Sequence, residues 1–240
     1  MSKRKIVLLA SALCMVAILA IGGTLAYFTD TDAKTNTFTI GALDITLVED
    51  FDSSNAMLKP GKANAVNKDV SIKLNDGSVD SYVWYEWLIP SALDSTDGST
   101  GTNNIVHVNS LGSTWDKYRE NSAYWPEGQT EALPLEQTWD HDSMGVQGFI
   151  RTEEVGGILY NVYVALYHGK LSAGQETTIG MTQAYLDSKV DYDGTNYTIN
   201  GTAIDYDFDN GVDIIVRAYG IQADGFADVY EAYAAYQAQK

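Results

Sequence analysis

The chain begins with a short basic head and a long apolar run. Three basic residues at positions 3–5 are followed by almost exclusively apolar side chains over residues 6–21, and a pair of glycines ends the run. This order is typical of a secretory signal peptide. The run is shorter than the ~20 residues that a stable membrane-spanning helix needs. We therefore expect a signal peptide over residues 1–26 and a single mature domain over residues 27–240, with an uncleaved membrane anchor as the alternative.

Beyond the signal, apolar and polar side chains alternate with the period of a half-buried strand. The alternation predicts an N-terminal strand segment over residues 27–48. Aromatic and β-branched runs predict further strands over residues 81–89, 157–167 and 213–219. Turn signals separate such runs at Asp76-Gly77, Asp193-Gly194, Asn200-Gly201 and Asn210-Gly211. The last of these is expected to close a hairpin between residues 204–208 and the strand that begins near Val212.

Helical periodicity is confined to two places. We expect a short helix over residues 180–186 and a longer C-terminal helix over residues 225–239, with Asp224 as its cap. The apolar stripe of the longer helix is expected to pack on its own domain; it consists of Phe226, Val229, Tyr230, Tyr233 and Ala234. Many short strands with tight turns and little alternation of strands and helices predict an all-β fold, an antiparallel β-sandwich.

A long polar segment interrupts this pattern. Residues 94–145 are rich in Ser, Thr, Asn and Gly, and they exceed an ordinary loop several-fold. We interpret them as an insertion with a short strand near residues 105–108. Its aromatic side chains, among them Trp115, Trp125 and Trp139, are a candidate ligand-binding surface, because aromatic faces stack on sugar rings. The alternative is that they anchor the long segment to the sandwich.

The charge of the chain restricts its partners. Removing the signal takes away three basic residues and no acidic one, which brings the formal net charge from −17 to −20. A chain this acidic is repelled by nucleic acid and by anionic membrane surfaces, so we expect no nucleic-acid partner. Cationic polymers, divalent cations or colloidal stability outside the cell are the expected benefits. The single cysteine, Cys14, lies in the signal, so the mature chain forms no disulfide.

Patterns typical of catalysis or of tight metal binding are missing from the sequence. The HExxH pattern of zinc proteases is absent, and His107, His141 and His168 are far apart along the chain. There is neither a Gly-x-Ser-x-Gly elbow nor, after cleavage, a thiol. Residues 205–211 approach a calcium loop, but their glycine comes one residue late and the closing acidic position falls on Val216. We expect no catalytic residue, metal site or cofactor, with loosely bound calcium left open.

Three segments carry a family resemblance. They are GGTLAYFTDTDAKTNTFTIGALDITL at residues 22–47, LKPG at residues 58–61 and VDIIVRAYGIQADGF at residues 212–226. In these segments the chain resembles the camelysin and TasA-type family of secreted surface proteins of Gram-positive bacteria. The resemblance implies cleavage by a SipW-type signal peptidase, a jelly-roll-like sandwich and members that polymerise into fibres.

The resemblance and the alternation together suggest a function. We expect a secreted, non-enzymatic structural protein of the cell surface or biofilm matrix that associates with itself. After cleavage, the new N-terminal segment could add a strand to a neighbour's sheet, with Phe28, Phe38 and Ile40 as anchors. Pairing of this segment within its own domain is the alternative for the strand. A surface module that binds glycan or host protein, and a camelysin-like metalloprotease, are the alternatives for the function.

The signal pattern yields a testable cleavage site. Thr24 and Ala26 supply the small side chains that a signal peptidase pocket accepts, so the mature chain should begin at Tyr27. N-terminal sequencing of the secreted protein measures this directly. A start outside residues 25–29, or an intact Met1, would contradict the site.

Overall fold

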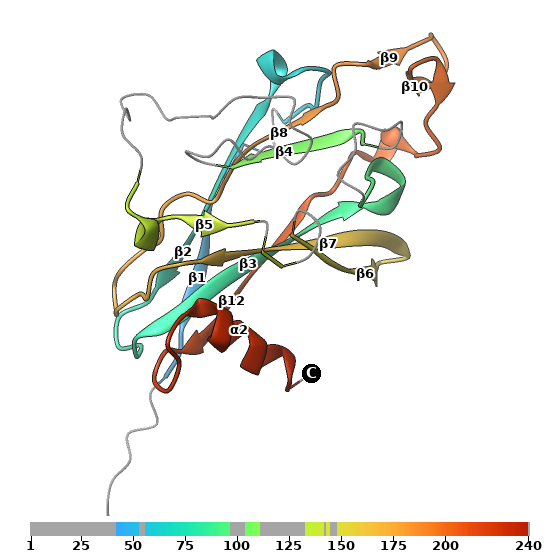
Figure 1. Ribbon diagram of the computed structural model, residues 1–240. Helices are drawn as coiled ribbons and strands as arrows, with labels where there is room; N and C mark the ends of the chain where they lie inside the picture. Colours follow the sequence, from blue (N-terminus) through green and yellow to red (C-terminus); the bar gives the residue numbers. More distant parts are fainter. Residues whose placement is uncertain are drawn as a thin grey trace, which may run out of the picture. The chain divides into compact units, whose positions relative to one another are not determined.

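The described part of the chain forms three antiparallel sheets and one C-terminal helix (Figure 1). The computed structural model describes residues 42–52, 56–96, 104–110, 133–141, 143–144 and 148–239. The first sheet contains β1 (Ile45–Asp50), β2 (Val66–Leu74), β8 (Met181–Leu186) and β4 (Val106–Ser110), in the order β1-β2-β8-β4. The second contains β12 (Ile215–Gln222), β3 (Ser81–Pro90), β7 (Ile158–Tyr167) and β5 (Trp139–Asp140), in the order β12-β3-β7-β5, and β6 (Phe149–Val155) also pairs with β7. The predicted all-β sandwich is confirmed.

The main core lies between these two sheets. β3 runs through the middle of the second sheet and buries all ten of its side chains. Its odd-numbered residues from Val83 to Ile89 face the first sheet, where they meet Val70, Ile72 and Leu74 of β2. Trp87 stacks on Tyr163 of β7, with 5.4 Å between the ring centroids. Burial on both faces explains why the sequence of β3 is a nearly continuous apolar run instead of an alternating one.

The opposite face of β3 is covered by the C-terminal helix, α2 (Val229–Gln237). Trp84 makes edge contacts with Tyr233 and Tyr236, at centroid distances of 5.3 and 4.9 Å. The predicted helix and its packing on its own domain are therefore found. Its cap differs from the prediction: the side chain of Asp228, not of Asp224, accepts a hydrogen bond from the Glu231 amide. No helix among residues 42–239, as far as they are described, is long and apolar enough to span a membrane.

A third, small sheet follows β8. It contains β9 (Val190–Tyr192), β10 (Tyr197–Ile199) and β11 (Thr202–Ala203), with β10 in the middle. The predicted turn at Asn200-Gly201 joins β10 and β11, and both of its residues have positive φ, at 50° and 78°. Two successive positive φ values match the tight hairpin turn that Asn-Gly favours.

Two local predictions are wrong. Residues 180–186 were expected to be helical, but residues 181–186 form β8, which is paired on both sides by β2 and β4. Pairing in the middle of a sheet overrides a weak local preference. Residues 204–208 do not form a hairpin with β12. Asp207 instead accepts a hydrogen bond from the Asp209 amide and starts a 3₁₀ turn, Phe208–Asn210, while β12 pairs with β3.

The described parts of the long segment 94–145 belong to the sandwich. β4 lies at the edge of the first sheet beside β8, and β5 pairs with β7 in the second. His107 of β4 is buried and lies 3.1 Å from the Asp187 carboxylate, next to β8. The predicted strand near residues 105–108 is thus β4, and the segment contributes to both sheets.

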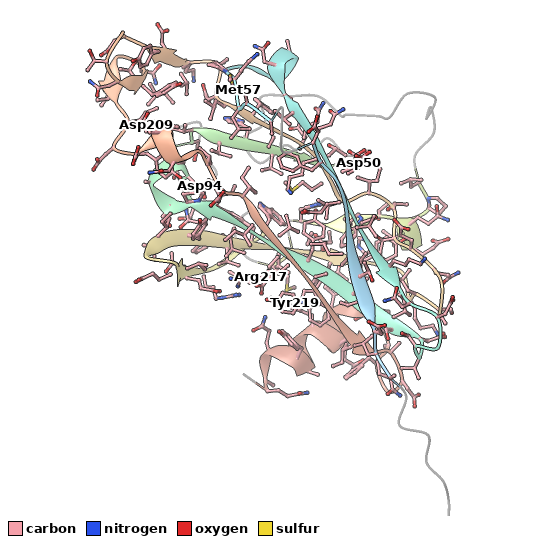
Figure 2. The ribbon with its side chains drawn as sticks, turned by 180° about the vertical axis from the view of Figure 1, so that it is seen from behind. Asp50, Met57, Asp94, Asp209, Arg217 and Tyr219 are labelled. Atoms are coloured by element: carbon pink, nitrogen blue, oxygen red, sulfur yellow. The ribbon has the colours of Figure 1, made fainter. Side chains whose placement is uncertain are left out.

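One buried carboxylate is held on the outer face of the second sheet. Glu86 of β3 is fully buried, and both of its oxygens accept hydrogen bonds of 2.8 Å from the guanidinium of Arg151 on β6. Glu153 bridges Arg151 to Arg217 of β12, which lies beside Tyr219 (Figure 2). The bonds from Arg217 and then Arg151 lower the pKa of Glu153, so this carboxylate stays ionised. The network ties three strands together around a charge that could not otherwise be buried.

The two arginines should differ in their effect on stability. Arg151→Met leaves the buried Glu86 carboxylate without its bidentate partner and should cost about 3 kcal/mol. For a domain of this size, that lowers the thermal midpoint by roughly 6–12 °C. The matched control Arg217→Met removes only a partly exposed ion pair and should cost less than about 1 kcal/mol. Calorimetry of both variants measures the difference, and equal midpoints would contradict the role of Glu86.

Candidate functional site: an open groove at one end of the sandwich

An apolar groove of about 390 Å³ opens at one end of the sandwich. One wall comes from the first sheet, with Val66 and Lys68 of β2 and Ala184 and Leu186 of β8. Residues 211–214, which lead into β12, form the opposite wall. Phe51, Met57, Leu58, Tyr197 and Phe208 complete the lining. Met57 lines the groove, is exposed over 65% of its surface and is labelled at this end of the molecule in Figure 2.

The single lysine of the groove does not make it polar. Lys68 Nζ lies 2.8 Å from the Glu49 carboxylate of β1 and 4.6 Å above the ring centre of Phe51. The lysine side chain is only 8% exposed. Its charge is therefore matched by Glu49 and covered by an aromatic face, a favourable arrangement for a cation. Apart from Lys68 and Asp213, the groove is lined by aliphatic and aromatic side chains and one glycine.

The groove is open because β1 is shorter than β2. The two strands pair from Ile45 opposite Leu74 to Asp50 opposite Asp69, where β1 ends. β2 extends further, and its first residues pair with β8 on the other side. Among the described strands, none covers this first part of β2 on the side of β1. An added strand would meet backbone groups there, beside the apolar groove.

The end of β1 also carries an unfavourable charge pair. Asp50 and Asp69 lie directly opposite each other in the ladder. Burial, and then the charge of Asp50, raise the pKa of Asp69. Like charges in this position weaken strand pairing. The repulsion lies where β1 stops, so it is a physical reason for the ladder to end there.

Both outer strands at this side of the sandwich are sheet edges. β1 pairs only with β2 and β12 only with β3 within the described chain. The two edges come close at the far end, where Leu43 lies against Gly220 of β12. Toward the groove they are separated by residues 211–214. The sandwich is thus narrow at one end of these edges and open at the other.

Most of the residues singled out from the sequence lie outside the described part of the chain. This holds for the cleavage residues Thr24, Ala26 and Tyr27, for the anchors Phe28, Phe38 and Ile40, and for Trp115 and Trp125. The groove itself was not predicted. Its only signal in the sequence is the apolar pair Met57-Leu58 before the turn at residues 59–61, since the other lining residues come from distant strands.

Trp139 is the one predicted ligand-binding residue that the structure places. Its ring packs between Tyr85 and Tyr167, with centroid distances of 4.7 and 5.1 Å. Its Nε1 donates a hydrogen bond of 3.0 Å to the carbonyl of Thr178. Trp139 therefore fixes β5 to the sandwich with both its ring and its polar atom.

The three histidines make separate structural contacts. His107 pairs with Asp187 in the first sheet, as described above. His141 is buried, and its Nε2 lies 3.0 Å from the hydroxyl of Tyr85. His168 contacts Thr138 through Nδ1, and the hydroxyl of Tyr230 through Nε2 at 3.1 Å. Tyr230 also donates to Asp140 at 2.6 Å, which links α2 to β5.

The N-terminal third of the chain matches a known protein family. Residues 2–84 match the model of the camelysin metallo-endopeptidase family. This match confirms the resemblance seen in the sequence. It covers the predicted signal, β1, β2 and the first part of β3. No curated protein and no solved structure matches the chain.

The family's description implies a metal centre, but the described residues do not fit one. A catalytic zinc needs three protein ligands and an open position. Here His107 lies in the first sheet and His141 directly after β5 of the second, and each is engaged by a neighbouring side chain. Within the described ranges, no group of three or more His, Cys, Asp and Glu side chains is placed to hold a metal ion. In residues 205–211, Asp207 is engaged by the Asp209 amide and by Asn210.

The buried His141 predicts that the stability of the fold depends on pH. Burial lowers the pKa of His141 to about 3, although Asp140 opposes this shift. The unfolded chain takes up the proton near pH 6.5, so the stability due to the neutral ring is complete above pH 6.5 and is lost as the pH falls toward 3. Between pH 7 and 4, the wild type should lose on the order of 2–3 kcal/mol more than His141→Gln. Thermal melts at both pH values test this, and parallel profiles would refute it.

Proposed function

We propose that the mature chain is a secreted structural protein of the Gram-positive cell surface or biofilm matrix, and that it polymerises by N-terminal strand donation. The observation that carries this proposal is the apolar groove beside the uncovered first part of β2. Such a place offers a strand two things at once: backbone partners for its amides and carbonyls, and dry space for its side chains. The resemblance of residues 22–47, 58–61 and 212–226 to the camelysin and TasA-type family supports the same proposal, whereas the description of the family model that matches residues 2–84 names a metallo-endopeptidase.

The proposed donor segment suits the groove in size and chemistry. A dry cavity of ~150 Å³ holds one benzene ring, so a groove of about 390 Å³ accepts about two large apolar side chains. Phe38 and Ile40 are two residues apart, and they therefore lie on one face of a strand. Burial of each contributes roughly 1.5–3 kcal/mol. Phe28 extends the apolar surface toward the new N-terminus.

Signal cleavage supplies the switch for assembly. Before cleavage, the donor segment is joined to the apolar run of residues 6–21; afterwards it has a free end at Tyr27. A donor at one place on the chain and an acceptor at another give a head-to-tail contact. Contacts of this kind do not close on themselves, so repeated addition produces filaments. A SipW-type peptidase would thus control when polymerisation begins.

A structural role also agrees with the side-chain chemistry. The buried histidines, the buried carboxylates and Trp139 are all engaged in holding strands together. The residues that line the groove are mostly aliphatic or aromatic. Such a surface suits the packing of another chain and not the activation of a nucleophile.

Charge placed in the groove should block assembly without unfolding the protein. Met57 is largely exposed, so Met57→Asp should leave the thermal midpoint within about 2 °C of the wild type. It puts a carboxylate where the donor side chains must be dry, so filaments should be lost. The matched control is Leu135→Asp, at a residue that is 68% exposed and does not line the groove. Negative-stain microscopy of the cleaved proteins should show filaments for the control only.

Mixing two defective chains tests the direction of donation. Phe38→Asp damages the donor and keeps the groove, whereas Met57→Asp damages the groove and keeps the donor. A mixture allows one contact per pair and should form dimers but no filaments. Each protein alone should be monomeric in sedimentation velocity. A mixture that stays monomeric would support pairing of the segment within its own chain, and filaments of Met57→Asp would rule out the groove.

A further inference from the structure

A cluster of four aromatic rings covers the small sheet next to the groove. Tyr192 of β9 lies 5.1 Å from Tyr197 of β10, measured between ring centroids. Tyr197 lies 4.5 Å from Phe208, and Phe208 lies 5.0 Å from Tyr206. The rings therefore form a continuous surface, which we call the aromatic platform. Its rings come from β9, from β10, from the 3₁₀ turn at residues 208–210 and from Tyr206 just before that turn.

The platform is open to solvent and hollowed. Tyr192 is 55% exposed and Tyr197 38% exposed, and they are adjacent in one cluster, as exposed aromatic rings of binding sites are. A depression of about 290 Å³ lies over them, at the small end of the range for small-molecule sites. Thr195, Asn196, Asp207 and Asp209 surround the rings at its rim. The depression thus combines an aromatic floor with a polar rim.

The charge around the platform is of one sign. Residues 190–214 contain six aspartates and no lysine, arginine or histidine. All six are exposed, at positions 191, 193, 205, 207, 209 and 213. The amides of Asn196 and Thr195 donate to Asp193 and lower its pKa, so it remains ionised. Asp209 projects at this end of the molecule (Figure 2). The local field therefore favours a cationic ligand.

We propose that the aromatic platform binds a cationic glycan, a polymer of hexosamines whose amino groups are not acetylated. A sugar ring presents a flat apolar face that stacks on Tyr192 and Tyr197. Its hydroxyls find partners in Thr195 and Asn196. Its ammonium group is attracted by the carboxylates of the rim. The rings, the polar side chains and the carboxylates of the site thus match the apolar face, the hydroxyls and the ammonium group of an amino sugar. The depression has the size of a single sugar unit of a chain.

A basic peptide fits the site less well. Lysine and arginine side chains need carboxylates or one ring face, as in a cation–π contact. They do not need a depression with a rim of hydroxyl and amide groups. A peptide also binds best along an exposed strand edge, whereas the platform is made of side chains from three separate segments.

The platform can be tested apart from filament assembly. Tyr197 and Phe208 line both the groove and the depression, so neither is a useful site for substitution. Tyr192 and Asp209 line only the depression, and Met57 lines only the groove. Binding can therefore be measured on monomeric Met57→Asp, or on the wild type if that protein is itself monomeric. A failure of the assembly proposal leaves this measurement intact.

The experiment is calorimetric titration of the cleaved chain with a glucosamine hexamer. Tyr192→Ser should weaken binding about tenfold, and Tyr192→Phe, which keeps the ring, should restore it. Asp209→Asn should weaken binding about threefold and reduce its dependence on salt. The control Glu154→Gln removes the same charge from an exposed position on β6 and should have no effect. Thermal melts of all variants should agree with that of the parent protein.

Two competing ligands define what would overturn the proposal. The N-acetylated hexamer keeps the sugar faces but lacks the charge, and it should bind at least tenfold more weakly. Equal binding of the two hexamers would overturn recognition of the amino group. Hexalysine carries the charge without the rings, and its binding should not change in Tyr192→Ser. Hexalysine binding that matches the glucosamine hexamer, or a hexamer affinity unaffected by Tyr192→Ser, would reduce the platform to a general acidic surface.

Discussion

β3 must be covered on both of its faces, and the rest of the structure follows from that requirement. Its ten buried side chains include two tryptophans, two tyrosines and one glutamate. The first sheet covers one face, and α2 with β6 covers the other. Without α2, Trp84 would lie in water; without Arg151, the Glu86 carboxylate would be buried without a counter-charge. The C-terminal helix and β6 are thus integral parts of the fold, because a strand with two apolar faces cannot end a sandwich.

The same construction leaves one end of the sandwich unfinished. The core between the sheets is complete from Leu74 to Val70 along β2, where β1 runs beside it. β1 stops at Asp50, where a second aspartate lies opposite, and among the described strands the first part of β2 has a partner on one side only. The part of β2 that β1 covers contributes to the stability of the domain, and the proposed assembly uses the part that β1 does not cover. This separation explains how an apolar groove can persist in a stable domain, since filling it is not needed for folding.

Acidic side chains have different surroundings in the interior and on the surface. Inside, the buried carboxylates are held by hydrogen-bond donors: Glu86 meets Arg151, Asp187 meets His107, and Asp94 accepts from Asn161 and Tyr163. Outside, the aspartates of residues 190–214 have no basic residue within their segment. In the part of the chain that the structure describes, most acidic side chains are therefore exposed, and only Glu86, Asp94 and Asp187 are buried. Such a surface repels its own copies, so the proposed polymerisation would need a specific apolar contact to overcome the repulsion.

The sequence alone determined the class of the fold, most of its strands and the C-terminal helix. These depend on periodicity and on turn residues such as Asn200-Gly201, which act locally. It also indicated the family through short segments at both ends. Only the tertiary structure decided that residues 181–186 are a central strand, that Asp207 starts a turn and that β4 and β5 join the sheets. It alone assembled the groove, whose walls are Val66, Leu186 and Val212, and the aromatic platform. The reason is physical: strand pairing and surface clusters join residues far apart in the chain, and a local pattern holds no information about which distant segment will become its neighbour.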